Sequence, residues 1–260
     1  MMKIDDVAIS RAILADYTAR FGESLESDVL IAGAGPSGLV AATTLARAKL
    51  RVVVLEKRLA PGGGTWGGGM LMNTVVTQPE AERLLVEFGV RYEVNADGLL
   101  VTQSVELGSA LILKAVQAGV VILNAVTVED VMVSGEQVTG LVANFTPVDA
   151  TRMHVDPLSF RARAVLDGTG HDAVVAGLLV KHGFQLRTAS GGIEGEGAMW
   201  ADKGEEAVVT YTREIFPGAY VSGMAACSVF GGPRMGPIFG GMLLSGEKVA
   251  ELIIKALGQQ

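Results

Sequence analysis

The sequence has 260 residues, of which 49% are hydrophobic and 5% aromatic, and its formal net charge is −7. This length predicts a single α/β domain over residues 1–260 with an aliphatic core. The acidic balance argues against a nucleic-acid partner, and charges interrupt each candidate membrane span. One cysteine, Cys227, excludes an internal disulfide, and no signal-peptide pattern is present, so we expect a cytoplasmic protein.

The first expected elements are a helix and a βαβ unit. Residues 4–21 carry apolar side chains at roughly helical spacing, which predicts an N-terminal helix that packs on the sheet or on another subunit. Residues 28–32 centre on the run Val-Leu-Ile, as in a strand covered on both faces. A helix over residues 37–49 and a second strand over residues 51–55 complete the unit.

The turn after the first strand has the pattern Gly-x-Gly-x-x-Gly. Gly33 permits the tight turn, Gly35 lets a pyrophosphate approach the backbone, and Gly38 lets the helix pack closely on the strand. The second strand ends at Glu56, which lies 56 − 33 = 23 positions after Gly33, where an acid binds ribose hydroxyls. The pattern predicts an adenine dinucleotide with its phosphates at the helix N-terminus. The alternative, a turn that merely requires glycine, explains neither the spacing nor the acid.

The rest of the chain predicts a return to the same sheet after a β-rich excursion at about residues 120–166. A glycine-rich loop over residues 62–69 is expected to bring its backbone close to a ligand. Residues 134–136 lie between two alternating segments and predict a hairpin turn, and residues 190–206 are expected to be mobile. The other expected elements are helices over residues 78–88 (with Gly89 as C-cap), 101–118, 172–182 and 237–257, and strands over residues 90–93, 120–123, 127–133, 137–143, 161–166 and 219–222.

Two of the three histidines lie near acids in short segments. His154 and Asp156 are two positions apart, so an extended segment would present both on one face. His171 follows a Gly-Thr-Gly turn after a strand, where α/β sheets present ligand-binding groups. Imidazole and carboxylate suit iron, manganese or zinc, and a small ligand set leaves positions open for substrate. The alternative is a hydrogen-bonded His–Asp support, and His182 is expected to be structural.

A second candidate group is Arg234, which lies among glycines and prolines. Pro237 fits the first position of a helix, so Arg234 is expected to project from the loop just before that helix. A guanidinium held there can bind a carboxylate or a phosphate with two hydrogen bonds. The alternative is an ordinary surface arginine.

The order of elements resembles the two-dinucleotide-binding-domain flavoprotein superfamily. The resemblance implies an α/β, Rossmann-like dinucleotide-binding fold of that type, with a mixed sheet and an inserted β-rich lobe. In flavoenzymes of this group the late strand usually ends in Gly-Asp, but residues 221–226 read Val-Ser-Gly-Met-Ala-Ala. The missing aspartate and the short chain argue against flavin. An FAD-dependent reductase or monooxygenase remains the alternative enzyme, and a non-catalytic nucleotide-binding protein is the third hypothesis.

More specific motifs resemble the thiazole synthases of thiamine biosynthesis, from about residue 10 to the C-terminus. The resemblance implies that NAD is consumed as a substrate: nicotinamide is lost, the ADP-ribose condenses with glycine, and sulfur is added to give an ADP-linked thiazole carboxylate. The segments that carry the resemblance are residues 33–38, 55–58, 62–69, 200–209, 212–214, 223–224 and 232–241, together with the two His/Asp segments.

The source of sulfur differs within that family. Fungal and plant members give up the sulfur of a cysteine that lies two residues before an Asp-Pro pair. Here that position is His154, and Cys227 lies in a different segment. The chain therefore resembles the archaeal-type, sulfide-dependent members, which implies free sulfide as the sulfur source and multiple turnovers.

The resemblance also implies roles for individual residues. Iron(II) is held by Asp156 and His171 from adjacent subunits, His154 contacts substrate or relays a proton, and Arg234 holds the glycine carboxylate. A site shared between subunits requires a homo-oligomer, and the family forms octamers. The implied NAD site comprises Ser37, Glu56, Lys57, Gly64, Val128, His154 and Met224, beside the motif glycines Gly33, Gly35 and Gly38.

Overall fold

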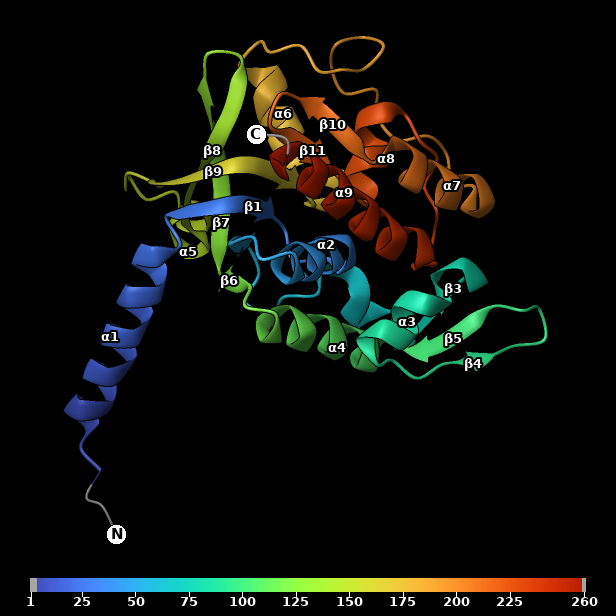
Figure 1. Cartoon of the computed structure of the whole chain (residues 1–260), viewed down its shortest axis with the longest axis horizontal. Helices are drawn as coiled ribbons and strands as arrows, with labels where there is room; N and C mark the ends of the chain where they lie inside the picture. Colours follow the sequence, from blue (N-terminus) through green and yellow to red (C-terminus); the bar gives the residue numbers. More distant parts are fainter. Residues whose placement is uncertain (1–3, 259–260) are drawn as a thin grey trace.

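The fold is organised around one twisted sheet. The computed structural model describes residues 4–258, and within that range this sheet has eight strands. They are β1 (Glu26–Ala32), β2 (Val52–Glu56), β6 (Val121–Asn124), β7 (Val126–Ser134), β8 (Gln137–Phe145), β9 (Leu158–Asp167), β10 (Arg213–Phe216) and β11 (Ala219–Val221). The order is β10–β11–β9–β1–β2–β6, and the β7–β8 hairpin attaches to β9 through β8 (Figure 1). In this spatial order, β11, β9, β1, β2 and β6 are parallel to one another. Strand β10 and the hairpin add antiparallel pairs.

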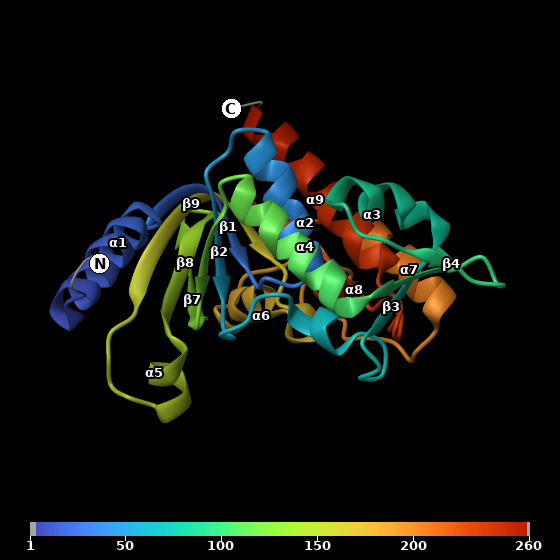
Figure 2. The same cartoon turned by 90° about the horizontal axis from the view of Figure 1, so that it is seen from below.

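Helices and the hairpin cover both faces of this sheet. The helices are α1 (Asp6–Glu23), α2 (Pro36–Arg47), α3 (Glu82–Phe88), α4 (Ser104–Gln117), α5 (Thr146–Thr151), α6 (Val174–Lys181), α7 (Ala201–Tyr211), α8 (Met224–Phe230) and α9 (Gly240–Gly258), with 3-10 turns at Gly63–Gly67, Pro79–Ala81 and Gly170–Asp172. Helices α2, α4 and α9 lie side by side on one face, and α6, α8 and the hairpin pack on the other (Figure 2).

The central strand β1 is buried on both sides. Val29 and Ile31 belong to one core cluster, whereas Leu30 and Ala32 belong to the other. Each side chain is fully buried, as expected for a parallel strand between two layers of helices. The predicted α/β fold with a mixed sheet and a β-rich segment is confirmed, and the hairpin closes where expected, with Ser134 paired to Gln137.

A smaller antiparallel sheet lies beside α3 and α4, with the order β3–β5–β4. Its strands are β3 (Thr74–Thr77), β4 (Glu93–Val94) and β5 (Leu100–Gln103). The predicted helix over residues 101–118 is wrong at its start, because residues 100–103 pair with both neighbouring strands and α4 begins only at Ser104. A four-residue strand ahead of an apolar helix gives no separate periodicity, so its pairing partners decide the conformation. Likewise, the strand expected over 90–93 forms at Glu93–Val94, and 78–88 divides into a 3-10 turn and α3.

Backbone hydrogen bonds tie residues 190–206 to a neighbouring helix. Glu194 N donates to Val229 O at 3.1 Å and Gly195 N to Ser228 O at 3.0 Å, so the backbone is tied to α8. The end of this segment belongs to α7. These hydrogen bonds satisfy buried backbone groups of a glycine-rich segment, and its predicted mobility stays a prediction.

The closing helix also begins later than predicted. Pro237 is not its first residue, because Phe239 N donates to Val76 O of β3 at 2.9 Å and α9 begins at Gly240. This pairing holds the chain extended next to β3 before the helix starts. The loop that carries Arg234 is therefore separated from α9 by a short paired segment, contrary to the prediction.

Helix α1 projects from the rest of the molecule (Figure 1). None of its residues is fully buried, so the first predicted alternative, packing on the sheet, is wrong for most of the helix. Only its last turns approach the core, where the Phe21 ring lies 5.8 Å from the rings of Phe145 and Phe160. The exposed apolar residues of this region are Ile4, Val7, Ile9, Ile13, Leu14 and Tyr17.

Candidate active site

A cavity of about 660 Å³ opens at the carboxyl ends of β1, β2 and β9. This edge is where parallel sheets bind ligands, and the volume is in the range of small-molecule sites. Three of the predicted site residues, Gly38, His154 and Asp156, do not line it. The predicted residues that do are Gly33, Gly35, Ser37, Glu56, Lys57, Gly64, Val128, His171, Met224 and Arg234.

The glycine turn fits the expected close approach of backbone segments. Gly33 has a φ of +94°, and a Cβ atom there would lie 2.5 Å from the carbonyl oxygen of Gly168. A Cβ atom on Gly38 would lie 2.3 Å from the carbonyl oxygen of Gly33. Gly38 therefore allows α2 to pack against the turn and does not itself contact the cavity. Gly35 lines the cavity as the N-cap of α2, so the unpaired N–H groups of the first helical turn lie at the cavity edge.

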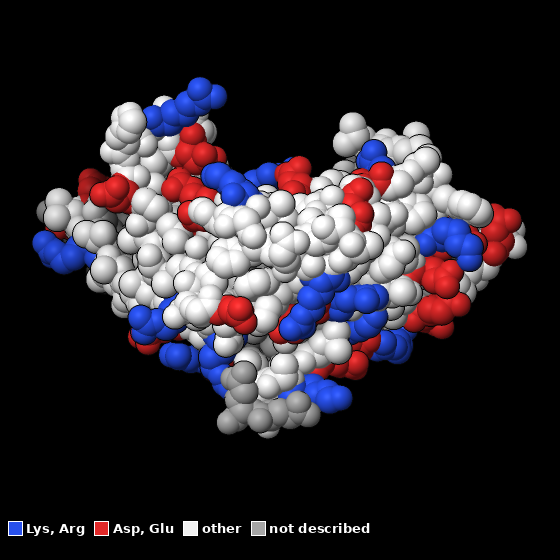
Figure 3. Space-filling view, turned by 90° about the horizontal axis from the view of Figure 1, so that it is seen from above, with Lys and Arg blue, Asp and Glu red and all other residues white. Residues whose placement is uncertain are grey.

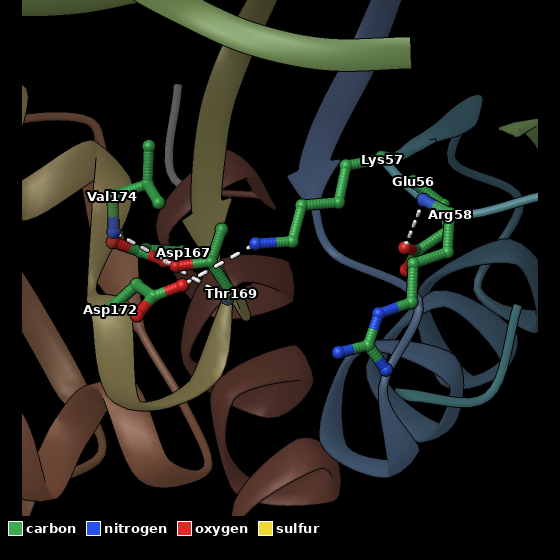
Figure 4. A network of polar contacts seen from close by, with 7 residues as sticks. All are labelled: Glu56, Lys57, Arg58, Asp167, Thr169, Asp172 and Val174. Carbon is green, nitrogen blue, oxygen red and sulfur yellow. Dashed lines mark hydrogen bonds and ion pairs between the residues drawn. The ribbon is translucent and has the colours of Figure 1, made fainter. Parts of the chain in front are cut away.

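Glu56 is held at the end of β2 by backbone groups. Its side chain is buried, and its two carboxylate oxygens accept hydrogen bonds from Ala34 N and Arg58 N, each at 2.8 Å. A carboxylate oxygen has two lone pairs, so each oxygen keeps one acceptor position for a ligand hydroxyl. Figure 4 shows Glu56 and Arg58 on one side of the site, with the Lys57 side chain reaching toward the opposite side.

The opposite side is the turn that follows β9. Lys57 Nζ lies 3.4 Å from Asp172 Oδ2 of this turn (Figure 4). The turn is fixed by Asp167, which is fully buried and accepts hydrogen bonds from Thr169 Oγ1 (2.7 Å) and Ala176 N (3.1 Å). Burial raises the pKa of the Asp167 carboxyl, although these hydrogen bonds oppose the effect. The anchored turn sets the position of His171.

His171 is joined to Arg234 through a carboxylate. His171 Nδ1 lies 2.6 Å from Glu196 Oε1, and Arg234 Nε lies 3.7 Å from Glu196 Oε2. The backbone of His171 is also fixed, since Ser228 Oγ donates to its carbonyl oxygen at 3.1 Å. The Glu196 carboxylate thus connects two side chains that line the cavity, although Glu196 itself does not line it.

His154 and Asp156 lie elsewhere, on the exposed segment between α5 and β9. Figure 2 shows this segment projecting beyond the sheet with α5. The segment is not simply extended, because Val155 N donates to Met153 O at 3.0 Å. Within residues 4–258 no three His, Cys, Asp or Glu side chains gather as a metal site. The assignment of Asp156 and His171 to a metal stays a prediction.

Cys227 lies inside α8 and is fully buried. Burial raises the pKa of its thiol to about 12, and the nearby carboxylates of Glu196 and Glu205 add to the effect. The thiol is therefore protonated near neutral pH, which disfavours it as a nucleophile. His182 lies outside the cavity, and its Nε2 lies 2.7 Å from Asp130 Oδ1 on β7.

Sequence reasoning missed Glu196 and the α7–α8 framework around it. The only available signal is an acid between two glycines, Gly195 and Gly197, in a segment that looked mobile. On the surface, Figure 3 shows one face that is largely uncharged, with acidic and basic side chains next to one another around it. In the part of the chain from residue 4 to 258, no helix is both long and apolar enough to cross a membrane.

The parallel sheet, the glycine turn and Glu56 at the end of β2 define a protein of the Rossmann-like dinucleotide-binding fold. The chain belongs to the Thi4 family, whose sequence profile matches residues 10–239. It is 51% identical to a thiamine thiazole synthase of Methanothermobacter thermautotrophicus, over 98% of this chain and 100% of that protein. It is also 51% identical to a thiamine thiazole synthase of Pyrococcus abyssi, over 97% and 98% of the two chains. The crystal structure of Thermovibrio ammonificans THI4 is 45% identical and superposes with a TM-score of 0.97, covering 99% of this chain and 100% of that one.

Proposed function

We propose that this protein is a thiamine thiazole synthase that consumes NAD, glycine and free sulfide and forms an ADP-linked thiazole carboxylate. The observation that carries the proposal is that the glycine turn after β1, His171 and Arg234 line one and the same cavity. The near full-length relatives named as thiamine thiazole synthases support it. The required chemistry is the loss of nicotinamide, condensation of the ADP-ribose with glycine, addition of sulfur and ring closure.

Different residues of the cavity bind different parts of the reactants. The first turn of α2 binds the pyrophosphate, and the free lone pairs of Glu56 accept hydrogen bonds from the adenosine ribose. This orientation directs the second ribose toward the turn of His171. The Arg234 guanidinium, at the same cavity, binds the carboxylate of glycine. Holding the two reactants side by side removes much of the entropic barrier to their condensation.

Free sulfide is the proposed sulfur source because the chain offers no suitable thiol. Cys227 is buried, and its pKa is raised to about 12. His154 occupies the position at which the resemblance implies a sacrificial cysteine in fungal and plant enzymes. The enzyme would therefore act repeatedly, with His154 contacting substrate or relaying a proton.

The donor set fits a shared iron(II) site better than a site within one chain. His171 lines the cavity, whereas Asp156 is exposed on a projecting segment. We propose that Asp156 of one copy approaches His171 of another, so that the protein acts as a homo-oligomer, with the octamer of the family as the expected state. One imidazole and one carboxylate suit iron(II), which would supply Lewis-acid polarisation and positioning of reactants.

The direct test is an anaerobic incubation of the purified protein with NAD, glycine, iron(II) and sulfide. Mass spectrometry should detect the ADP-linked thiazole, in more than one equivalent per chain. Omission of sulfide should abolish the product. Bound flavin in the purified protein would instead support the alternative oxidoreductase, and unchanged NAD in every mixture would support a non-catalytic nucleotide-binding protein.

A mixing experiment tests the shared site. His171→Ala and Asp156→Ala should each lose iron binding and product formation. When the two variants are co-expressed in equal amounts, about half of the subunit pairs should contain one copy of each variant. One of the two sites in each mixed pair is intact, so about a quarter of the wild-type sites should be regained. Each variant expressed alone provides the control, because neither of its sites is intact. Absence of recovery in properly assembled mixtures would contradict a site shared between subunits.

A further inference from the structure

Glu196 links two groups of the cavity that come from different parts of the chain. Its side chain is only 16% exposed, whereas those of His171 and Arg234 are 52% and 58% exposed. One carboxylate oxygen lies 2.6 Å from His171 Nδ1, and the other lies 3.7 Å from Arg234 Nε. The more buried partner is thus placed between the two more exposed ones.

The backbone around Glu196 is fixed by neighbouring segments. Gly195 N donates to Ser228 O at 3.0 Å, and Gly197 N donates to Gly232 O at 2.9 Å. The hydroxyl of Ser228 in turn donates to the His171 carbonyl oxygen at 3.1 Å. Helix α8 therefore holds both the carboxylate and the histidine backbone in one frame. Because its backbone is fixed in this way, the Glu196 carboxylate can determine the orientation of the His171 and Arg234 side chains.

We propose that Glu196 is a positioning residue for both halves of the reaction site, a role that rests on the proposed function. By accepting a hydrogen bond from Nδ1–H, Glu196 selects the His171 tautomer whose Nε2 lone pair is available to a ligand. A carboxylate at Nδ1 also makes Nε2 a stronger donor to a metal ion. Asp172 does not supply this contact, because its carboxylate pairs with Lys57.

The second contact prepares Arg234 for an anionic substrate. Glu196 approaches the Nε side of the guanidinium. The two terminal nitrogens can then form the paired hydrogen bonds that a substrate carboxylate accepts. The same Glu196 carboxylate thus restrains the imidazole and the guanidinium, so that its loss should affect metal binding and substrate binding together.

Glu196→Ala and Glu196→Gln test this role, with Glu194→Gln as the matched control. Glu194 lies two residues away on the same segment, and its carboxylate accepts from Ser190 N, away from the site. Binding of iron(II) alone is measured by anaerobic calorimetry, and binding of NAD is measured separately. Glycine KM and kcat are measured with saturating NAD and sulfide.

We expect Glu196→Ala to weaken iron(II) binding by about 10–100-fold, because the partner of a metal-binding histidine typically contributes that much. Glu196→Gln retains an acceptor for Nδ1–H and should lose less iron affinity, whereas both variants should raise the glycine KM. NAD affinity should stay within about twofold of wild type, since Glu196 does not line the dinucleotide turn. Glu194→Gln should match wild type in all measurements.

The outcomes separate this role from the proposed function. If wild-type protein binds iron(II) and both Glu196 variants bind it equally well, the positioning role is wrong. It is also wrong if Glu194→Gln reproduces the losses, because general loosening of the segment would then explain them. If wild-type protein itself neither binds iron(II) nor forms product, the proposed function fails.

Discussion

A buried carboxyl in α7 gives the protein a predictable dependence of stability on pH. Glu205 Oε2 accepts a hydrogen bond from Gly241 N of α9 at 2.6 Å. Within residues 4–258, its other oxygen is buried and has no hydrogen-bond partner of normal geometry. Burial raises the pKa of the Glu205 carboxyl from 4.5 to about 6, and the charge of Glu80 adds to the effect. Protonation of Glu205 therefore removes the unfavourable burial of a charge.

The sign and size of the effect follow from this pKa. Between pH 4.5 and about 6 the folded protein binds more protons than the unfolded chain, so its stability falls as pH rises. A difference of about 1.5 in pKa corresponds to about 2 kcal/mol in total. About 1.3 kcal/mol of this should be lost between about pH 5 and about pH 8.

Glu205→Gln should remove this loss. The amide oxygen can still accept from Gly241 N. The side chain stays neutral at both pH values, so no charge is buried when the pH rises. Relative to wild type, the variant should therefore gain about 1.3 kcal/mol in the free energy of unfolding between about pH 5 and about pH 8. Urea unfolding at one fixed protein concentration measures the difference at both pH values.

Glu206→Gln is the matched control, because Glu206 is the next residue and its side chain is 69% exposed beside Lys203. It should show almost no pH-dependent difference from wild type. An equal effect of Glu205→Gln at both pH values, or a lower relative stability at the higher pH, would refute the reasoning.

Three further changes probe the turn, the sulfur source and the N-terminal helix. Gly38→Ala should lower stability by about 1–3 kcal/mol through overpacking, whereas Gly35→Ala, with its nearest atom 4.0 Å away, should mainly weaken NAD binding in calorimetry. Equal effects of the two would contradict their separate roles. Cys227→Ala should keep multiple turnovers with sulfide, and loss of sulfur insertion in a folded variant would implicate the thiol. Deletion of residues 1–16 should leave the far-UV spectrum of the remainder native-like but reduce the oligomer size by light scattering, because α1 has no buried residue. An unchanged oligomer would exclude α1 as an interface.

The sequence alone determined the βαβ unit and the edge of the sheet at which its ligand is expected. The glycine spacing and Glu56 lie within one short stretch, so local periodicity and turn chemistry specify them. Glu56 and the turn line one cavity, as expected from strands whose carboxyl ends lie at the same edge. The burial of β1 on both faces of the sheet was also predictable from the sequence, because its consecutive apolar side chains point to both faces.

Tertiary structure alone decided the contacts between distant segments. Glu196 meets His171 across 25 positions of sequence, and it does so because α8 pairs with the backbone of residues 194–195. Phe239 pairs with Val76 and delays α9, which no local signal indicates. Hydrogen bonds and burial between remote segments overrule glycine content and helix propensity, because unpaired backbone groups in a packed interior are unfavourable. The linked carboxylate at the cavity is therefore a property of the packed chain and of no single motif.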